Sequence, residues 1–176
     1  AVGVAEPAEL LAGLEKAGNA GVIPADIVAA WNAWNAGRLA DAEARFIRAD
    51  AKDISGGAAR WHAEALLRGS PAAGRAPDYP AGARRLLAAC GKGEAQAAMT
   101  LLDLDGQHLL ELRTEEIDAC AAVAASGQTP DAAYVKAVLD LRKDSPPDPA
   151  ATRRLLERAA DAGHVRAMLL LAGLHA

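Results

Sequence analysis

Aromatic and β-branched residues are scarce in this chain. Of its 176 residues, one is Phe, two are Tyr and three are Trp, and 52% are hydrophobic, mostly Ala and Leu. Strands favour β-branched and aromatic residues, whereas Ala and Leu are strong helix formers. The composition therefore argues against a sheet and predicts an all-α protein with enough apolar residues for an ordinary core.

Cysteine is nearly absent as well. Cys90 and Cys120 are too few for a disulfide framework and lack the CxxC spacing of zinc or redox sites. We expect them not to be joined. Their register on neighbouring helices adds an axial offset of about one turn to the ~8–10 Å between packed helix axes, which exceeds the ~7 Å Cα separation that a disulfide tolerates.

The chain has neither a dense basic run nor a long apolar one. With a net charge of −4, it carries no electrostatic footprint for nucleic acid. No apolar run approaches the ~20 residues of a membrane-spanning helix, so we expect no direct membrane insertion.

The excess of 14 Arg over 5 Lys is typical of high-GC bacteria, and the small-residue start without Met favours a periplasmic over a cytoplasmic location.

Motifs that carry chemistry are missing too. No GxxxxGK[ST], GxGxxG or GxSxG is present. We expect no metal, no cofactor and no catalytic residue, and we interpret Glu115 and Glu116 as the first turn of a helix, where the macrodipole favours carboxylates. Four histidines form no HxxH, HxxxH or HExxH pair: His62, His108, His164 and His175.

What the chain does have is repetition. RRLLAACGKGEAQA begins at Arg84, and RRLLERAADAGHVRA begins at Arg153. Periods of 20 to 50 residues indicate arrays of one supersecondary unit, which cannot bury its apolar face alone. Glycines that mark equivalent turns recur at steps of 36, 36, 34 and 36 residues: Gly21, Gly57, Gly93, Gly127 and Gly163.

Each repeat is interpreted as two antiparallel helices. Alanine and leucine recur at steps of three and four residues, and Pro80 and Pro149 fit a helical first turn behind the acidic caps Asp78 and Asp148. Single helices are expected at both ends, Glu6–Ala17 and His164–Leu174. The boundaries predicted are a half-repeat 6–20, units 21–56, 57–92, 93–126 and 127–162, and a terminal helix 163–176, with turns between helices at Gly37, 69–78, 105–114 and 143–149.

The stretch AWNAWNAGRLADAEARFIRA resembles a tetratricopeptide motif, with Ala30 at a close-packing position, Gly37 at the turn and Leu39 after it. The later units are similar to Sel1-like repeats, and the resemblance runs from Leu10 to Leu174. It implies one right-handed α-solenoid of about nine helices in antiparallel pairs over residues 1–176.

The resemblance also implies a concave groove that binds another protein, either a folded partner or a peptide segment. In the tetratricopeptide register, Trp31, Trp34 and Asn35 face that groove, and Glu64 and Arg68 join it from the next unit. We interpret Trp61 as directed to the core.

The expected function is therefore a non-enzymatic scaffold or adaptor. Two alternatives stay open: an immunity-type inhibitor that blocks a single bacterial toxin, and a hydrolase. An adaptor is expected to bind extended peptides or several clients, whereas an inhibitor is expected to bind one folded enzyme tightly. Turnover of a model ester or lactam would indicate the hydrolase.

Overall fold

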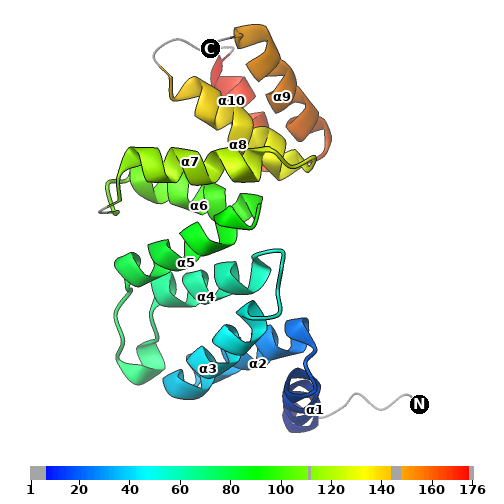
Figure 1. Cartoon of the computed structure of the whole chain (residues 1–176), viewed down its shortest axis with the longest axis vertical. Coiled ribbons are helices and arrows are strands. Elements are labelled where there is room, and N and C mark those ends of the chain that lie inside the picture. The colour runs from blue at the N-terminus through cyan, green and yellow to red at the C-terminus, as the bar shows by residue number, and fades with distance from the viewer. Residues whose placement is uncertain (1–6, 111, 144–147, 175–176) are drawn as a thin grey trace, which may run out of the picture. The chain divides into compact units, whose positions relative to one another are not determined.

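The computed structural model describes residues 7–110, 112–143 and 148–174 (Figure 1). These ranges contain ten α-helices, one short 3₁₀ helix and no strand beyond an isolated bridge between Ser70 and Arg75. The all-α prediction is confirmed. The helices number ten rather than about nine, because four pairs are flanked by one further helix at each end.

The helices follow one another at short intervals along the chain. Their bounds are α1 Pro7–Asn19, α2 Ile23–Asn35, α3 Leu39–Asp50, α4 Gly57–Arg68, the 3₁₀ helix Pro71–Ala73, α5 Tyr79–Gly91, α6 Ala95–Gly106, α7 Thr114–Ala125, α8 Pro130–Leu141, α9 Pro149–Asp161 and α10 Val165–Leu174. The expected end helices match α1 and α10 closely. Glu6, the expected first residue, lies outside the described residues.

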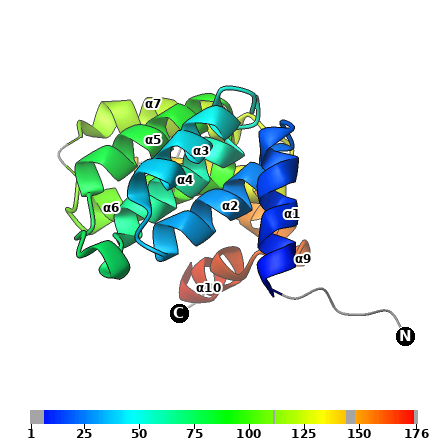
Figure 2. The same ribbon diagram turned by 90° about the horizontal axis from the view of Figure 1, so that it is seen from below.

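The chain divides into two compact units, Ala1–Arg85 and Leu86–Ala176. In the first unit α1 packs on α2, α2 on α3 and α3 on α4. Figure 2 shows α1 crossing α2 steeply, while α2 and α3 run side by side. Small residues make this close approach feasible, since Ala30, Ala33 and Ala42 are fully buried around the rings of Trp34 and Phe46.

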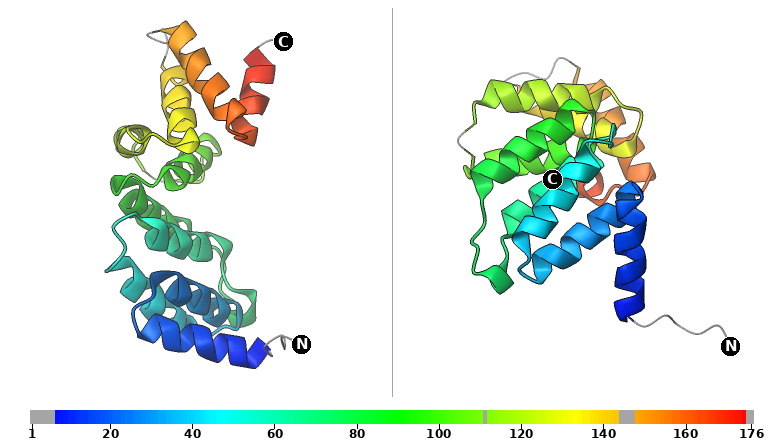
Figure 3. Two further views of the ribbon diagram at one scale, coloured as in Figure 1. Left: turned by 90° about the vertical axis from the view of Figure 1, so that its right-hand side faces the viewer. Right: turned by 60° about the horizontal axis from the view of Figure 1, so that its bottom comes forward.

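The second unit is built in the same sequential way from the end of α5 to α10. Helix α8 packs on α9 and α9 on α10, as the left view of Figure 3 shows. Ala133, Ala137 and Ala159 are buried around Leu156 in this part of the core. Successive helices therefore pack as neighbours within each unit.

The predicted turns agree with the structure. Helix α3 begins two residues after Gly37, and the segment 69–78 joins α4 to α5 over its full predicted length. The caps are confirmed as well, because Asp78 and Asp148 each accept a hydrogen bond from a backbone N–H three residues later. The turns predicted at 105–114 and 143–149 overlap the helix ends by one or two residues, because α6 runs to Gly106, α7 begins at Thr114 and α9 begins at Pro149; residue 111 and residues 144–147 lie outside the described residues.

The marker glycines are equivalent only in part. Gly21, Gly93 and Gly163 have φ values of +94°, +88° and +88° at the end of a helix. The equivalence of Gly57 is wrong, because Gly56 takes the positive φ of +87° and Gly57 becomes the first residue of α4. Gly127 does not have a positive φ either, and Thr129 caps α8 with its side chain instead.

The expectation that the two cysteines stay apart is also wrong. Cys90 on α5 and Cys120 on α7 form a disulfide, with Cα atoms 5.7 Å apart. The expectation assumed the axis separation of helices with average side chains. At these two residues the backbones of α5 and α7 approach more closely than that separation allows.

Candidate functional site

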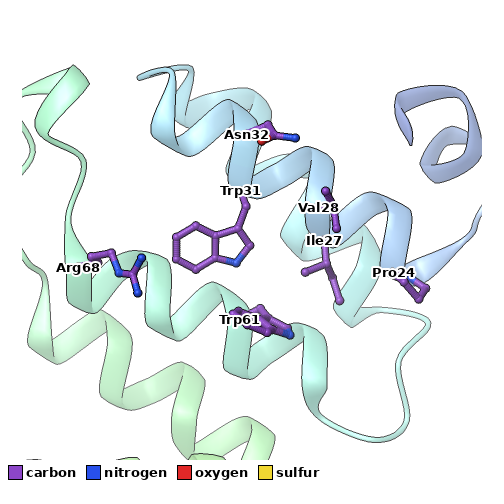
Figure 4. A pocket seen from close by; sticks show the side chains of 7 residues that line it. All are labelled: Pro24, Ile27, Val28, Trp31, Asn32, Trp61 and Arg68. Carbon is purple, nitrogen blue, oxygen red and sulfur yellow. The ribbon is translucent and has the colours of Figure 1, made fainter. Parts of the chain in front are cut away.

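An open pocket of about 530 Å³ lies between α2 and α4 in the first unit (Figure 4). Its volume is within the range of ~300–1,000 Å³ typical of ligand sites. Its lining is largely apolar and aromatic, with one amide and one charged side chain. The lining residues are Pro24, Ile27, Val28, Trp31, Asn32, Trp61 and Arg68.

Helix α2 supplies most of the lining from one face. Pro24, Ile27, Val28 and Trp31 follow one another at steps of three, one and three residues, so their side chains share a helical stripe. Val28 is 43% exposed, whereas Ile27 and Trp31 pack partly against the core. This face is apolar yet remains accessible to solvent.

Trp31 links the pocket to the core. Its ring meets Phe46 edge to face at a centroid distance of 6.3 Å, and it meets Trp61 in the same way at 6.0 Å. Such T-shaped pairs satisfy the quadrupoles of both rings. The two indoles therefore support each other at one corner of the pocket. Trp31 is half-buried, and Trp61 is 37% exposed.

Two arginines of α4 stack on these indoles. The Arg60 guanidinium lies 4.3 Å from the centroid of Trp61, and Arg60 also pairs with Glu64 at 2.5 Å. The Arg68 guanidinium lies 5.3 Å from the centroid of Trp31 and is exposed to solvent. In the described residues Arg68 has no carboxylate partner, so its charge is available at the pocket.

The structure distributes the predicted site residues over different environments. Trp31 and Arg68 line the pocket together, whereas Glu64 is half-buried and held by Arg60. Asn35 is exposed at the last turn of α2 and does not line the pocket.

Trp34 lies in the core rather than at an exposed surface. It is 1% exposed, and its Nε1 donates to the Gly69 carbonyl at 2.7 Å. The Ser70 hydroxyl donates to the Trp34 carbonyl at 2.9 Å, and the Arg75 guanidinium lies 5.3 Å from its ring centroid. We call this arrangement of Trp34, Gly69, Ser70 and Arg75 the loop clasp, because it fastens the segment 69–78 onto the end of α2.

Trp61, interpreted from the sequence as a core residue, is the indole that opens to solvent. Its position seven residues before Arg68 places both on one face of α4. That spacing was readable in the sequence, but the burial of Trp34 by a distant loop was not.

Gly69 is required by the geometry of the clasp. Its φ is +69°, and a Cβ at this position would lie 2.5 Å from the Arg75 carbonyl oxygen. No other residue avoids both the left-handed backbone penalty and this backbone clash.

A buried ion cluster fixes the opposite face of α2. Asp26 is 2% exposed and accepts hydrogen bonds from the Arg48 guanidinium, while Arg45 Nη1 lies 3.8 Å from the same carboxylate. The hydrogen bond to Asp26 raises the pKa of Arg48. A Cβ on Gly18 would lie 2.6 Å from Asp26 Oδ1, so α1 also approaches this carboxylate closely. These contacts fix α2 on the face opposite the pocket.

The titratable side chain of His62 is buried in the core of the first unit. His62 stacks on Phe46 with ring centroids 4.9 Å apart, and burial is the largest cause that lowers its pKa from 6.5 to about 4. It is therefore neutral at physiological pH. Within the described residues, no group of three or more His, Cys, Asp or Glu side chains gathers as metal ligands would, and no helix is long and apolar enough to span a membrane.

Comparison of the chain with protein-family models, with curated proteins and with solved structures finds no match. The pocket between α2 and α4 is therefore the candidate functional site.

Proposed function

We propose that the chain is a non-enzymatic scaffold that binds another protein through the pocket between α2 and α4. The observation that carries the proposal is the pair of indoles, half-buried Trp31 and exposed Trp61, beside Arg68, which has no carboxylate partner among the described residues. Trp and Arg are the side chains most enriched at interface positions that dominate binding energy. Exposed apolar surface of this kind marks interaction sites more often than it occurs without a use.

The pocket is also preorganised in the free chain. Asp26 and its arginines hold one face of α2, and the loop clasp holds the end of α2. A surface fixed in this way loses little conformational entropy on association. This rigidity supports a recognition site over an adaptable loop surface.

The proposal keeps the architecture that the repeat resemblance implies, a right-handed winding of antiparallel helix pairs. The packing of successive helices within each unit supports it. Arrays of this kind use the continuous surface of stacked helices to bind partners.

A capture experiment tests the proposed function. The chain, Trp61→Ala and the control Ile54→Ala are immobilised, and proteins retained from a bacterial lysate are identified by mass spectrometry. Ile54 is a suitable control, because it is apolar and 91% exposed but does not line the pocket. We expect partners shared by the unaltered chain and Ile54→Ala that Trp61→Ala fails to retain.

Partners retained equally by all three proteins would contradict the proposal. A single retained enzyme whose activity the chain blocks would indicate an immunity-type inhibitor acting through the same surface.

A further inference from the structure

Resting on the proposed function, we infer that the pocket recognises a peptide segment in which a large apolar side chain stands next to a carboxylate. The apolar side chain enters the pocket between α2 and α4, and the carboxylate pairs with Arg68. The segment is extended across the open side of the pocket rather than enclosed by it.

The apolar half of the motif follows from the lining. Pro24, Ile27, Val28 and Trp31 line the pocket from α2, and Trp61 lines it from α4 and meets Trp31 edge to face (Figure 4). Burying a large aliphatic or aromatic side chain among such groups is favourable, because it removes apolar surface from water. Asn32 is the one uncharged polar side chain in the lining, and its amide can bond the peptide backbone.

The acidic half of the motif follows from charge complementarity. Of the residues that the structure describes, Arg68 is the only charged one that lines the pocket. In the described residues its one specific contact is with the face of Trp31, and no carboxylate neutralises it. A guanidinium held over an indole keeps its N–H donors free at the ring edge, where they can form a bidentate pair with a carboxylate.

The same contacts exclude a basic partner segment. Arg68 already stacks on Trp31 and Arg60 on Trp61, so each indole has a cation over its face. A lysine, an arginine or a methylated ammonium group would be repelled by the Arg68 guanidinium, whereas Arg60 is paired with Glu64 and adds little repulsion. The aromatic corner is therefore suited to apolar and acidic groups.

The open side of the pocket favours a peptide over a small amphipathic carboxylate as the ligand. Val28 and Trp61 are 43% and 37% exposed, so the pocket lies open along one side. Small-molecule sites bury ~70–90% of their ligand. An open pocket leaves room for the backbone on both sides of the inserted side chain.

Selection from a random-sequence peptide library displayed on phage tests the inference. Four immobilised proteins are compared: the unaltered chain, Arg68→Gln, Trp61→Ala and the control Arg84→Gln. Arg84 is an exposed arginine of the first unit that does not line the pocket. Circular dichroism confirms that each variant is folded before selection.

We expect the unaltered chain and Arg84→Gln to enrich peptides in which Asp or Glu adjoins a large apolar residue. Arg68→Gln keeps the apolar preference and loses the acidic one, and Trp61→Ala loses both. For one selected peptide, replacing the acidic residue by its amide weakens binding to the unaltered chain about tenfold, as expected for a charge-assisted hydrogen bond, but not to Arg68→Gln.

The remaining outcomes overturn one claim or both. Apolar peptides enriched without acidic residues, or an acidic preference unchanged in Arg68→Gln, overturn the inference and leave the proposed function standing. Absence of any enrichment that depends on Trp61 overturns both. Binding of dodecanoate at the pocket with no peptide enrichment shows that the site serves a small carboxylate instead.

Discussion

The two compact units bury their helices with different side chains. The largest fully buried groups of the first unit include Trp34, Phe46 and Asp26, whereas those of the second include Leu86, Leu101 and Ile117. The first unit thus uses rings and a buried charge, and the second uses aliphatic side chains and the disulfide between Cys90 and Cys120.

Their cavities differ in the same way. The pocket of the first unit is lined mainly by apolar and aromatic groups and by Arg68, which has no carboxylate partner in the part of the chain that the structure describes. The second unit has a cavity of about 380 Å³ beside α7 and α8, where Arg142 lies 3.3 Å from Asp118 and Lys143 pairs with Asp140 at 2.8 Å. Lys136 also lines this cavity and has no ion-pair partner among the described residues, so the two cavities differ mainly in the two indoles that line the first. The aromatic lining supports the proposal that recognition belongs to the first unit.

The largest expected effect concerns the loop clasp. Trp34→Ala removes a buried ring and its hydrogen bond to Gly69, and we expect it to lower the unfolding free energy by about 4 kcal/mol. Urea unfolding followed by tryptophan fluorescence measures this change, since all three tryptophans belong to the first unit. A loss of less than about 1 kcal/mol would show that the clasp is not what stabilises this unit.

Removing the buried charge is expected to cost nearly as much. Asp26→Ala leaves the guanidinium groups of Arg45 and Arg48 without their shared partner, and breaking such a pair costs ~3–5 kcal/mol. Asp41→Ala is the matched control, because Asp41 pairs with Arg45 at 2.8 Å near the surface and such pairs contribute ~0–1 kcal/mol. Equal losses in the two variants, again measured by urea unfolding, would contradict the role given to Asp26.

The disulfide distinguishes the second unit. Reducing it is expected to destabilise this unit by ~2–4 kcal/mol, because the bond closes a long loop in the unfolded chain. Amide hydrogen exchange of α6 to α8, with and without dithiothreitol, measures the change. Exchange in α2 and α3 is expected to stay the same, and Cys90→Ser with Cys120→Ser serves as the control that no longer responds to reductant.

The sequence allowed much of the fold to be predicted. Helical periodicity predicted the pairs, and the breakers around Gly37 and in 69–78 predicted their turns. The same local signals assigned the turn before α4 to Gly57 instead of Gly56. The two glycines are adjacent, and either can adopt a positive φ. Which of two neighbouring glycines turns the chain depends on the packing of α4.

The candidate site was predicted only in part, for a similar reason. Trp31 and Trp34 are three residues apart on one helix, so periodicity places both near the same face. The loop clasp then covers Trp34, and no repeat pattern encodes the folding of the segment 69–78 over that ring. The disulfide escaped prediction because α5 and α7 approach each other more closely at the cysteines than average helices do.

Another effect on stability depends on pH. The His62 pKa is lowered to about 4 in the folded chain against 6.5 when unfolded, chiefly by burial, so folding favours the neutral ring. Its contribution of about 3 kcal/mol is complete above pH 6.5, decreases as the pH falls from 6.5 to 4, and is absent below that range.

Urea unfolding at several pH values, compared between the unaltered chain and His62→Leu, isolates this effect from the titration of carboxylates. A pH dependence that is identical in the two proteins would mean that His62 is not the group responsible.

The most direct test of the central claim uses Trp61→Ala, with affinity for a selected peptide and unfolding free energy measured on the same protein. We expect affinity to fall about thirtyfold, equivalent to ~2 kcal/mol, because Trp61 forms the exposed corner of the pocket. We expect stability to fall by only about 1 kcal/mol, far less than in Trp34→Ala. Unchanged affinity together with a stability loss of ~3–5 kcal/mol, the signature of a core residue, would contradict the assignment of recognition to this pocket.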